Sequence, residues 1–175
     1  MNVLAKRKRL LANLAFLLVL AGGFLWLTVE RSPEQRKPVP PVSMTFLDGS
    51  KPTLADYRGK VVLGVFWSVS CKICAKEIPH LNALYDKSDK NNFVIIGFDM
   101  PYDRPDWTVK FVKQRPIKYP VSLDLDGAIA RAFGGIEATP TTVLIDKQGR
   151  VVWKRLGRID FAKLETEIQA LSTES

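Results

Sequence analysis

The pattern of apolar and polar side chains divides the chain into three stretches. Residues 10–29 are almost continuously apolar, and their polar side chains are Asn13 and Thr28. Residues 30–41 are charged and rich in proline, a composition that favours an extended, semi-rigid spacer. From there to the C-terminus short apolar runs alternate with amphipathic stretches, and this pattern predicts one compact domain over residues 42–175.

Within that domain, two continuous apolar runs predict strands that are buried on both faces, at residues 60–67 and 93–98. Residues 75–85 carry apolar side chains on one side and predict a helix, in which Pro79 introduces a kink. The other predicted elements, in chain order, are a strand and turn over 42–49, a helix that starts at Pro105, a short helix over 127–133, a hairpin of 141–146 and 151–156, and a last helix capped by Asp160. Because strands and helices alternate before an antiparallel hairpin closes the sheet, we expect an α/β fold with a mixed sheet.

Composition and charge narrow the class of protein. With 175 residues, of which 46% are hydrophobic and 25% charged, the chain can form one globular core plus an appendage. Its formal net charge of +8 is the kind of excess that nucleic-acid-binding proteins carry. The basic cluster Lys6–Arg9, however, directly precedes the apolar stretch, and the other basic residues are scattered among acidic ones. The sequence therefore argues against a nucleic-acid partner.

The apolar stretch and its basic neighbour predict a membrane anchor. A helix needs about 20 apolar residues to cross a hydrocarbon layer of ~30 Å, and residues 10–29 have that length. The basic residues 1–9 should stay in the cytoplasm, so we expect a single-pass helix in the cytoplasmic (inner) membrane, with the domain in the periplasm or another extracytoplasmic space. A cleaved signal peptide ending at Val19–Ala21 is the alternative, although the apolar run continues through Phe24–Leu27. A lipid anchor is excluded because no cysteine lies near Gly22.

Both cysteines of the chain lie in the segment WSVSCKICAKEIPH, residues 67–80. A structural disulfide between Cys71 and Cys74 would close almost no loop and would therefore add little stability. A structural zinc site needs four ligands, and the chain has two cysteines and one histidine, so no metal site is expected. A copper site and a Cys–His hydrolase are weaker alternatives, since His80 is better explained as an exposed helix residue. Two cysteines buried as apolar side chains are a further alternative, which would leave their position between a strand and a helix a coincidence.

The position of the cysteine pair favours redox chemistry. A buried strand ends at Trp67 and a helix begins beside Cys71, so the first sulfur lies at a helix N-terminus, where the dipole lowers the pKa of a thiol from its usual value of about 8.5. Cys74 lies one turn later, within disulfide distance and facing further inward. This asymmetry suits an exchange in which Cys71 attacks a partner disulfide and Cys74 resolves the mixed disulfide. Glu77 shares a helix face with Cys74 and is either the base for its proton or a surface glutamate, and the spacing leaves both open.

Several further segments carry a family resemblance. Phe66–Trp67 precedes the CxxC motif, Pro79 follows it by five residues, and residues 138–150 read ATPTTVLIDKQGR. Together with FLDG at residues 46–49 and LADYRGKVV from residue 54, these segments resemble the thioredoxin superfamily, and more narrowly its membrane-anchored TlpA/ResA-like thiol–disulfide oxidoreductases. The resemblance covers the whole domain and implies a thioredoxin-like fold that works without a cofactor.

The resemblance also implies roles for individual residues. Pro140 would be a cis proline that faces the disulfide, and Thr139 before it would offer backbone groups to an extended substrate segment. Glu77 matches an acidic residue that ResA-like proteins carry in this helix, which favours its role as the base. Two positions depart from the family pattern: Ser70 stands where an aromatic side chain is usual, and Val65 stands where thioredoxin has a buried acid.

The function that the resemblance implies is reduction of specific protein disulfides outside the cytoplasm. The implied substrates are cytochrome c apoprotein thiols or a copper-site protein, and the implied electron donor is a membrane thiol carrier of the DsbD/CcdA type. An oxidase or isomerase of the same fold is an alternative, because the direction of exchange depends on the reduction potential. A metallochaperone-type binding module without turnover is another. A peroxiredoxin is disfavoured because Gly64 stands where the motif of that family has a proline.

Overall fold

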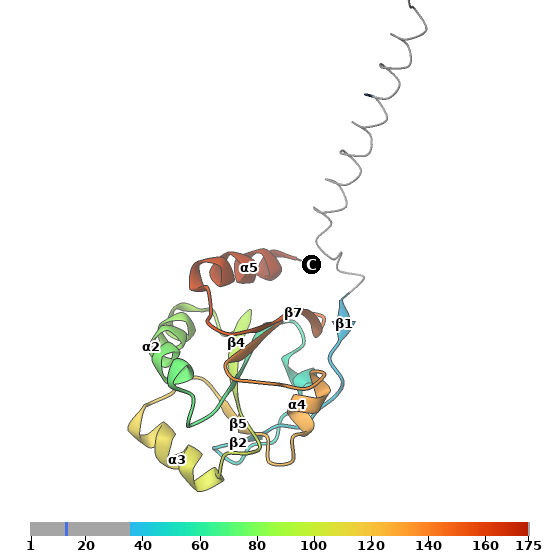
Figure 1. The fold of residues 1–175 in the computed structure, drawn as a ribbon. Helices are drawn as coiled ribbons and strands as arrows, with labels where there is room; N and C mark the ends of the chain where they lie inside the picture. Colours follow the sequence, from blue (N-terminus) through green and yellow to red (C-terminus); the bar gives the residue numbers. More distant parts are fainter. Residues whose placement is uncertain (1–12, 14–35, 175) are drawn as a thin grey trace, which may run out of the picture. The chain divides into compact units, whose positions relative to one another are not determined.

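The computed structural model describes Asn13 and residues 36–174. The predicted cytoplasmic N-terminus (1–9) and the predicted anchor (10–29), apart from Asn13, lie outside the described residues. Within the part of the chain that is described, no helix is both long and apolar enough to cross a membrane. Lys37–Ser175 form one of two compact units of the chain, and this unit contains the folded domain (Figure 1).

The described domain contains seven strands, four α-helices and one 3₁₀ helix. In chain order they are β1 (Lys37–Pro38), β2 (Thr45–Phe46), the 3₁₀ helix (Leu54–Tyr57), β3 (Val61–Trp67), α2 (Lys72–Lys87), β4 (Phe93–Asp99), α3 (Pro105–Gln114), β5 (Val121–Leu123), α4 (Ala128–Ala132), β6 (Thr141–Ile145), β7 (Arg150–Leu156) and α5 (Phe161–Thr173). The predicted strands, hairpin and helices are all present. The 3₁₀ helix and β5 were not predicted, because three or four residues are too few for a hydrophobic period to stand out.

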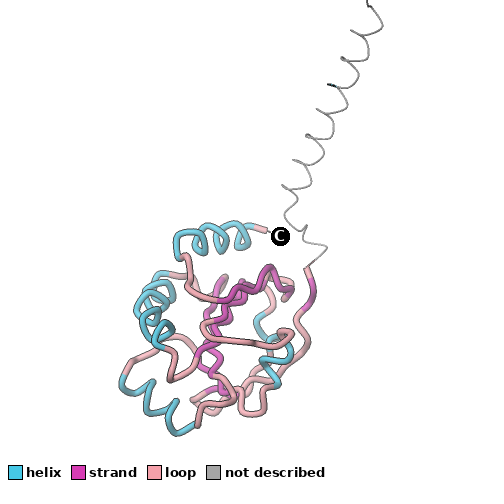
Figure 2. Tube along the Cα trace, viewed as in Figure 1, coloured by secondary structure: helices cyan, strands magenta, loops and turns pink. Residues whose placement is uncertain are grey.

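One seven-stranded sheet has the order β1-β7-β6-β3-β4-β5-β2. Figure 2 shows its strands in magenta, with helices in cyan around them. β3 pairs in parallel with β4, and β4 pairs in parallel with β5. β6 runs antiparallel to β3, and β7 runs antiparallel to β6. The predicted mixed α/β architecture is therefore confirmed, with β3 in the middle of the sheet.

Helices cover both faces of this sheet. On one face, Leu81 of α2 and Leu164 of α5 pack with side chains of β3 and β4. On the other face, Ile129 of α4 packs against the alternate side chains of the same strands. Phe111 of α3 packs beside α2, in a small apolar cluster that includes Cys74. Both central strands are thus buried on both sides, as their continuous apolar runs predicted.

Residues 37–38 form β1 in place of the expected spacer over 30–41. They pair antiparallel with β7. The next residue, Val39, is buried, and its N–H donates to the C=O of Gly149 at 3.0 Å. Residues 37–39 are therefore part of the domain, because the edge of β7 presents backbone groups that this segment satisfies.

Gly64, in the middle of β3, is required by packing. A Cβ atom at this position would lie 2.9 Å from Cε2 of Phe98 and 3.8 Å from the carbonyl oxygen of Val143. The ring of Phe98 is held in place by Phe66 and Phe133, at centroid distances of 4.8 and 6.1 Å. The missing side chain thus makes room for an aromatic cluster on this face of the sheet.

We predict that Gly64→Ala lowers the free energy of unfolding by about 1–3 kcal/mol, because the added methyl group overpacks the core. Chemical denaturation measures this loss. In a Phe98→Leu background the same substitution should cost less, since the smaller side chain leaves space. Equal costs in the two backgrounds would contradict this account of Gly64.

Candidate active site

The two cysteines form a disulfide at the start of α2, with their Cα atoms 5.3 Å apart. Cys71 is the N-cap residue of the helix, and its Sγ accepts a hydrogen bond from the N–H of Cys74 at 3.1 Å. The prediction that the first sulfur lies at a helix N-terminus is confirmed. Cys74 also faces further inward, as predicted: it is 5% exposed, whereas Cys71 is half-buried.

The strand β3 brings the chain to this point. Its last residue, Trp67, is buried, and the loop Ser68–Ser70 leads from it into the helix cap. The N–H of Cys71 donates to the C=O of Ser68 at 3.0 Å, and the N–H of Ala75 donates to the C=O of Cys71 at 3.1 Å. A tight loop therefore joins the central strand to the helix, so the sheet fixes the position of the sulfurs.

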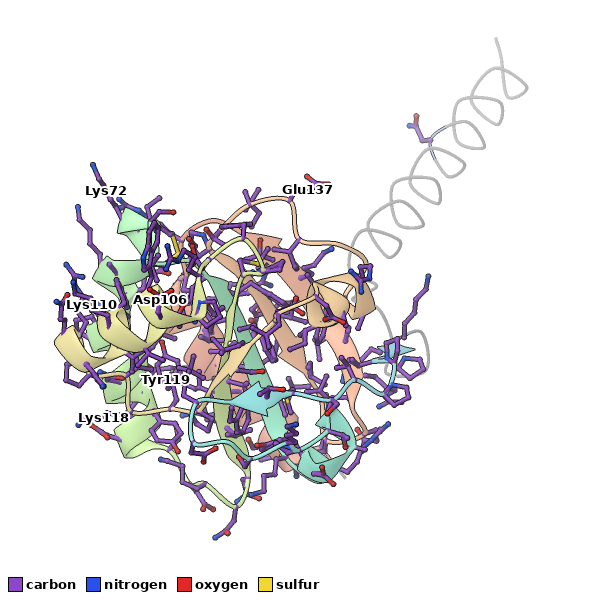
Figure 3. All side chains as sticks on the ribbon, turned by 90° about the horizontal axis from the view of Figure 1, so that it is seen from below. Lys72, Asp106, Lys110, Lys118, Tyr119 and Glu137 are labelled. Atoms are coloured by element: carbon purple, nitrogen blue, oxygen red, sulfur yellow. A yellow bond between two sulfur atoms is a disulfide. The ribbon has the colours of Figure 1, made fainter. Side chains whose placement is uncertain are left out.

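The surface around Cys71 is open to a large partner. Ser70 is exposed, and Ile73 between the cysteines is 38% exposed. Lys72 and Lys76 are exposed on the first turns of α2, and Lys72 extends away from the domain (Figure 3). Their positive charges favour a thiolate in the same direction as the helix dipole.

Glu77 is 7% exposed, so the interpretation as a surface glutamate is wrong. Its Oε1 accepts a hydrogen bond from the N–H of Ile159 at 2.8 Å, while its Oε2 has no hydrogen-bond partner among the described residues. Burial raises the pKa of Glu77, and the N–H of Ile159 and the charges of Arg158 and His80 oppose that rise. A carboxyl group of this kind, one turn from Cys74, can exchange protons closer to neutral pH than an ordinary glutamate can.

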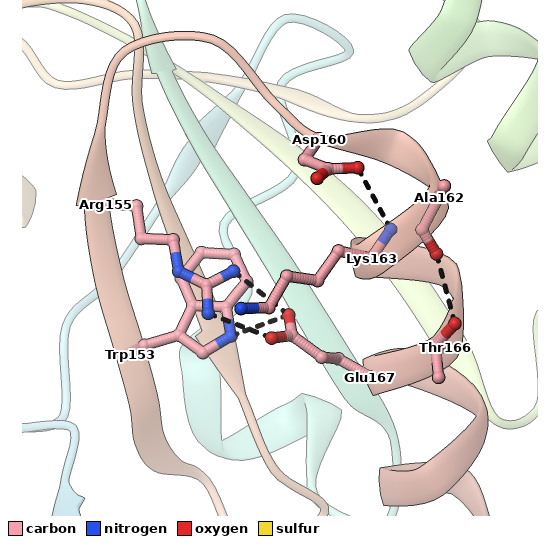
Figure 4. Close-up of polar contacts among 7 residues, drawn as sticks. All are labelled: Trp153, Arg155, Asp160, Ala162, Lys163, Thr166 and Glu167. Carbon is pink, nitrogen blue, oxygen red and sulfur yellow. Dashed lines mark hydrogen bonds and ion pairs between the residues drawn. The ribbon is translucent and has the colours of Figure 1, made fainter.

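The N–H that reaches this buried carboxyl lies in the connection between β7 and α5, which is firmly held (Figure 4). Asp160 caps α5, as predicted, by accepting a hydrogen bond from the N–H of Lys163 at 3.1 Å. Glu167 of α5 accepts hydrogen bonds from the indole of Trp153 at 3.0 Å and from the guanidinium of Arg155 at 2.9 and 3.1 Å. These contacts tie α5 to β7 and fix the connection that contacts Glu77.

The peptide bond between Thr139 and Pro140 is cis, as the resemblance implied. It directly precedes β6, whose first residue, Thr141, pairs with Phe66 near the end of β3. The register therefore places the cis proline beside the loop that leads to the cysteines. Pro140 is buried, and its C=O accepts a hydrogen bond from the N–H of Gly157 at 2.8 Å. Thr139 is half-buried, and no residue of the described chain forms a hydrogen bond with its backbone.

The sequence analysis did not single out a group of polar residues on the other side of the cysteine loop. Asp99 ends β4 at the same edge of the sheet, and it is 2% exposed. Its Oδ2 accepts a hydrogen bond from the hydroxyl of Thr108 at 2.5 Å. Asp103 accepts hydrogen bonds from the N–H of Val69 at 2.7 Å and from the hydroxyl of Ser68 at 3.0 Å. An acidic side chain therefore binds the loop that carries Cys71.

Burial raises the pKa of Asp99 to about 7. The neighbouring carboxyl of Asp103 adds to this rise, and the hydrogen bond from Thr108 opposes it. The sequence contained a signal for this residue, because Asp99 directly follows the predicted strand 93–98. Parallel strands end at the same edge of a sheet, and that edge is where such folds place their functional groups.

In the described part of the chain, no group of three or more His, Cys, Asp or Glu side chains is arranged to hold a metal ion. His80 is exposed, as predicted, and its ring stacks on Phe161 with a centroid distance of 5.3 Å. The chemistry that the arrangement offers is a disulfide that can take up two electrons, with buried carboxyl groups nearby that can take up or release protons.

A central parallel pair of strands, a disulfide in the first turn of the following helix and a cis proline beside it define a thioredoxin-like fold with a CxxC pair. The predicted resemblance to the thioredoxin superfamily is therefore confirmed. The chain belongs to the AhpC/TSA family, whose model matches residues 36–154.

Individual relatives support the same class of enzyme. The chain is 38% identical over 174 residues to a thiol-disulfide oxidoreductase ResA from Bacillus thuringiensis subsp. konkukian, covering 95% of this chain and 99% of the relative. It is 30% identical over 173 residues to the ResA from Geobacillus kaustophilus, covering 95% of this chain and 98% of the relative. Such extensive similarity, together with the CxxC pair, shows that the protein is a thiol–disulfide oxidoreductase.

Solved structures agree with this assignment. A protein from Neisseria meningitidis assigned as a thioredoxin superimposes with a TM-score of 0.73 at 33% identity, covering 81% of this chain and 93% of the other. The thioredoxin domain of a thiol-disulfide oxidoreductase from Bacteroides vulgatus superimposes with a TM-score of 0.66 at 26% identity, covering 75% and 96%.

Proposed function

We propose that this enzyme is tethered to the membrane, faces the extracytoplasmic space and reduces disulfides of specific partner proteins. The observation that carries the proposal is the asymmetry of the cysteine pair. One sulfur caps a helix at an open surface, and the other is buried one turn below it, on the helix face that carries Glu77.

Cys71 is the nucleophile in this proposal. As a thiolate it is stabilised by the N–H of Cys74 and by the helix N-terminus. Its Sγ attacks one sulfur of the partner disulfide, the S–S bond of the partner breaks, and the second partner sulfur leaves as a thiolate that takes up a proton. The enzyme and partner are then joined by a mixed disulfide.

Cys74 and Glu77 complete the exchange. Glu77 takes the proton of the Cys74 thiol through its unpartnered Oε2, and the resulting thiolate attacks the Sγ of Cys71. The mixed disulfide breaks, and the first partner sulfur leaves as a thiolate. Two electrons have then moved from the cysteine pair to the partner, and the enzyme holds the Cys71–Cys74 disulfide.

Thr139 and Pro140 bind the partner chain in this proposal. The backbone of Thr139 forms no hydrogen bond within the described residues, and it lies beside the cysteine loop. Its N–H and C=O are therefore available to an extended segment of the partner. Such main-chain recognition places the partner sulfur without depending on the side chains around it.

The tether and the partners rest on the N-terminal sequence and on the family. The basic residues 1–9 followed by the apolar residues 10–29 fit a single-pass anchor in the cytoplasmic (inner) membrane, with the domain facing the periplasm or another extracytoplasmic space. A reductase outside the cytoplasm needs an external supply of electrons, for which a membrane thiol carrier of the DsbD/CcdA type is suited. Cytochrome c maturation is the process in which we place its substrates.

We predict that a Cys74→Ser variant, expressed in its native envelope, accumulates mixed disulfides through Cys71, because the resolving sulfur is missing. Non-reducing electrophoresis shows them as bands that disappear on reduction, and mass spectrometry identifies the partners. A variant that lacks both cysteines is the control and should capture nothing. A binding module without turnover would give no captured partner in either variant. If Cys71 and Cys74 of the wild-type enzyme are found mainly as a disulfide in the envelope, the proposal that the enzyme acts as a reductase is contradicted.

We predict that Glu77→Gln slows resolution of a preformed mixed disulfide on the order of a hundredfold at neutral pH, because the amide cannot take the thiol proton. Glu77 acts as a base only when ionised, so the wild-type rate should rise as the pH increases through its raised pKa. Stopped-flow measurement of partner release tests both points. Glu137→Gln, which changes an exposed glutamate, is the matched control, and equal rates in the two variants would exclude Glu77 as the base.

We predict that the mature protein retains residues 10–29 and stays in the membrane fraction after alkaline extraction. Protease added outside the cytoplasmic membrane should digest the domain. The basic N-terminus stays in the cytoplasm, so the domain lies on the other side of the membrane. A soluble mature chain that begins just after Ala21 would show instead that the apolar stretch is a cleaved signal peptide.

A further inference from the structure

Asp99 and Asp103 face each other beside the loop that carries Cys71. Asp99 is buried at the end of β4, and Asp103 lies in the turn that leads to α3, where its N–H donates to the C=O of Met100 at 3.0 Å. The neighbouring carboxyl group of Asp103 contributes to the raised pKa of Asp99, so the two groups lie close to each other. Because a carboxylate has no hydrogen to donate, a hydrogen bond between them can form only when one of the two groups is protonated.

The contacts of Asp99 indicate where that proton lies. Oδ2 already accepts a hydrogen bond from the hydroxyl of Thr108, whereas Oδ1 is buried without a donor among the described residues. A proton on Oδ1 gives this atom a bond to Asp103 and removes the cost of a buried, unpaired charge. The carboxyl oxygens of Asp103 accept hydrogen bonds from the N–H of Val69 and the hydroxyl of Ser68.

The surroundings supply no cation that could replace the proton. Within the described residues, neither Asp99 nor Asp103 forms an ion pair. Arg104, at the start of α3, pairs instead with the exposed Asp106 at 3.0 Å. Asp124, in the connection from β5 to α4, donates its N–H to the C=O of Asp99 at 3.1 Å, but its carboxylate is directed to the first N–H groups of α4 at 2.8 and 2.9 Å. At the end of β3 that lies at this edge of the sheet, the first ionisable group along the chain is the Cys71 thiol itself.

We propose that Asp99 and Asp103 share one proton and act as positioning residues for Cys71, holding the loop Ser68–Ser70 in the geometry that places the sulfur at the helix cap. The proposal rests on the function proposed above for Cys71. Loss of the shared proton leaves two carboxylates in contact, so Asp103 is repelled from its place under the loop. The additional negative charge also disfavours a thiolate at Cys71.

The pair therefore makes the gain of thiolate at Cys71 with rising pH less steep than it is for an isolated thiol. An isolated cysteine gains thiolate steadily as the pH rises. Here the carboxyl pair loses its proton in the same pH range as the thiol, and its added negative charge disfavours ionisation of Cys71. In a partly solvated site, such repulsion lowers the ratio of thiolate to thiol at Cys71 roughly threefold to tenfold.

The experiment uses the full chain carrying Cys74→Ser, so that Cys71 is the only thiol. Its thiolate fraction is followed by ultraviolet absorbance between pH 4 and pH 10, and its rate of alkylation is measured over the same range. We expect a broadened titration in this parent and a sharper one in Asp99→Asn, whose amide donates to Asp103 at every pH. The thiolate-to-thiol ratio at neutral pH should be threefold to tenfold higher in Asp99→Asn. Asp106→Asn, which removes an exposed carboxylate of the same helix region, is the matched control and should resemble the parent.

Two further variants separate the shared proton from general damage to the fold. Thr108→Val removes the donor that favours ionised Asp99, so the titration of the pair should move to higher pH. Asp103→Asn removes the like charge, so the titration of Asp99 should move to lower pH. Carboxyl ¹³C shifts in the oxidised wild-type background, where no thiol titrates, report these movements directly. Opposite shifts support the proposal even if Asp99→Asn fails to fold, whereas absent or parallel shifts overturn it.

The possible failures are distinguishable. If Cys71 is alkylated readily but titrates identically in the parent, Asp99→Asn and Asp106→Asn, the carboxyl pair has no role in positioning it and the proposed function is unaffected. If Cys71 is unreactive at every pH in the parent, the nucleophilic role of Cys71 is refuted, and the role of the pair falls with it.

Discussion

The parallel pairing of β3 with β4 is the constraint on which the site depends. It aligns Trp67 with Asp99, so both strands end at the same edge of the sheet. The antiparallel strand β6 begins at that edge, which brings Pro140 to the same place. Because both central strands are buried on both faces, they cannot slide without exposing their side chains. The disulfide, the cis proline and the acidic pair are therefore brought to one place by the core of the sheet, and the hydrogen bonds that Asp103 accepts from the loop Ser68–Ser70 add to this arrangement.

The electrostatic arrangement around the cysteines has two parts that oppose each other. The N-terminus of α2 and its exposed lysines favour negative charge on Cys71. Buried carboxyl groups lie on both sides, with Glu77 below Cys74 on the helix and Asp99 at the end of β4. Burial raises the pKa of both acids, so each one holds a proton at a pH where an exposed acid has lost it. The site thus combines an easily ionised sulfur with groups that can supply or accept protons beside it.

Much of this was accessible from the sequence, because the signals were strong and local. The buried strands, the helix cap at Cys71 and the inward position of Cys74 follow from apolar runs and from the CxxC spacing. The cis bond before Pro140 came from family resemblance, since no local pattern distinguishes it from an ordinary loop proline. Spacing alone could not decide whether Glu77 is buried, because burial depends on tertiary contacts; the N–H that donates to its carboxyl group belongs to Ile159, which lies far along the chain. The contact of Asp103 with Val69 was missed for the same reason, as it joins two loops through the pairing of β3 and β4.

The cap of α2 has a consequence of its own. The Sγ of Cys71 changes its bonding during the reaction, and the same atom accepts the hydrogen bond from the N–H of Cys74 that caps the helix. A sulfur within a disulfide is a weak acceptor, whereas a thiolate is a charged and stronger one. The hydrogen bond that caps α2 is therefore stronger when the cysteine pair is reduced than when it is oxidised. A protein that docks on this turn meets two different surfaces in the two states, which gives donors and acceptors a physical basis for leaving once the transfer is complete.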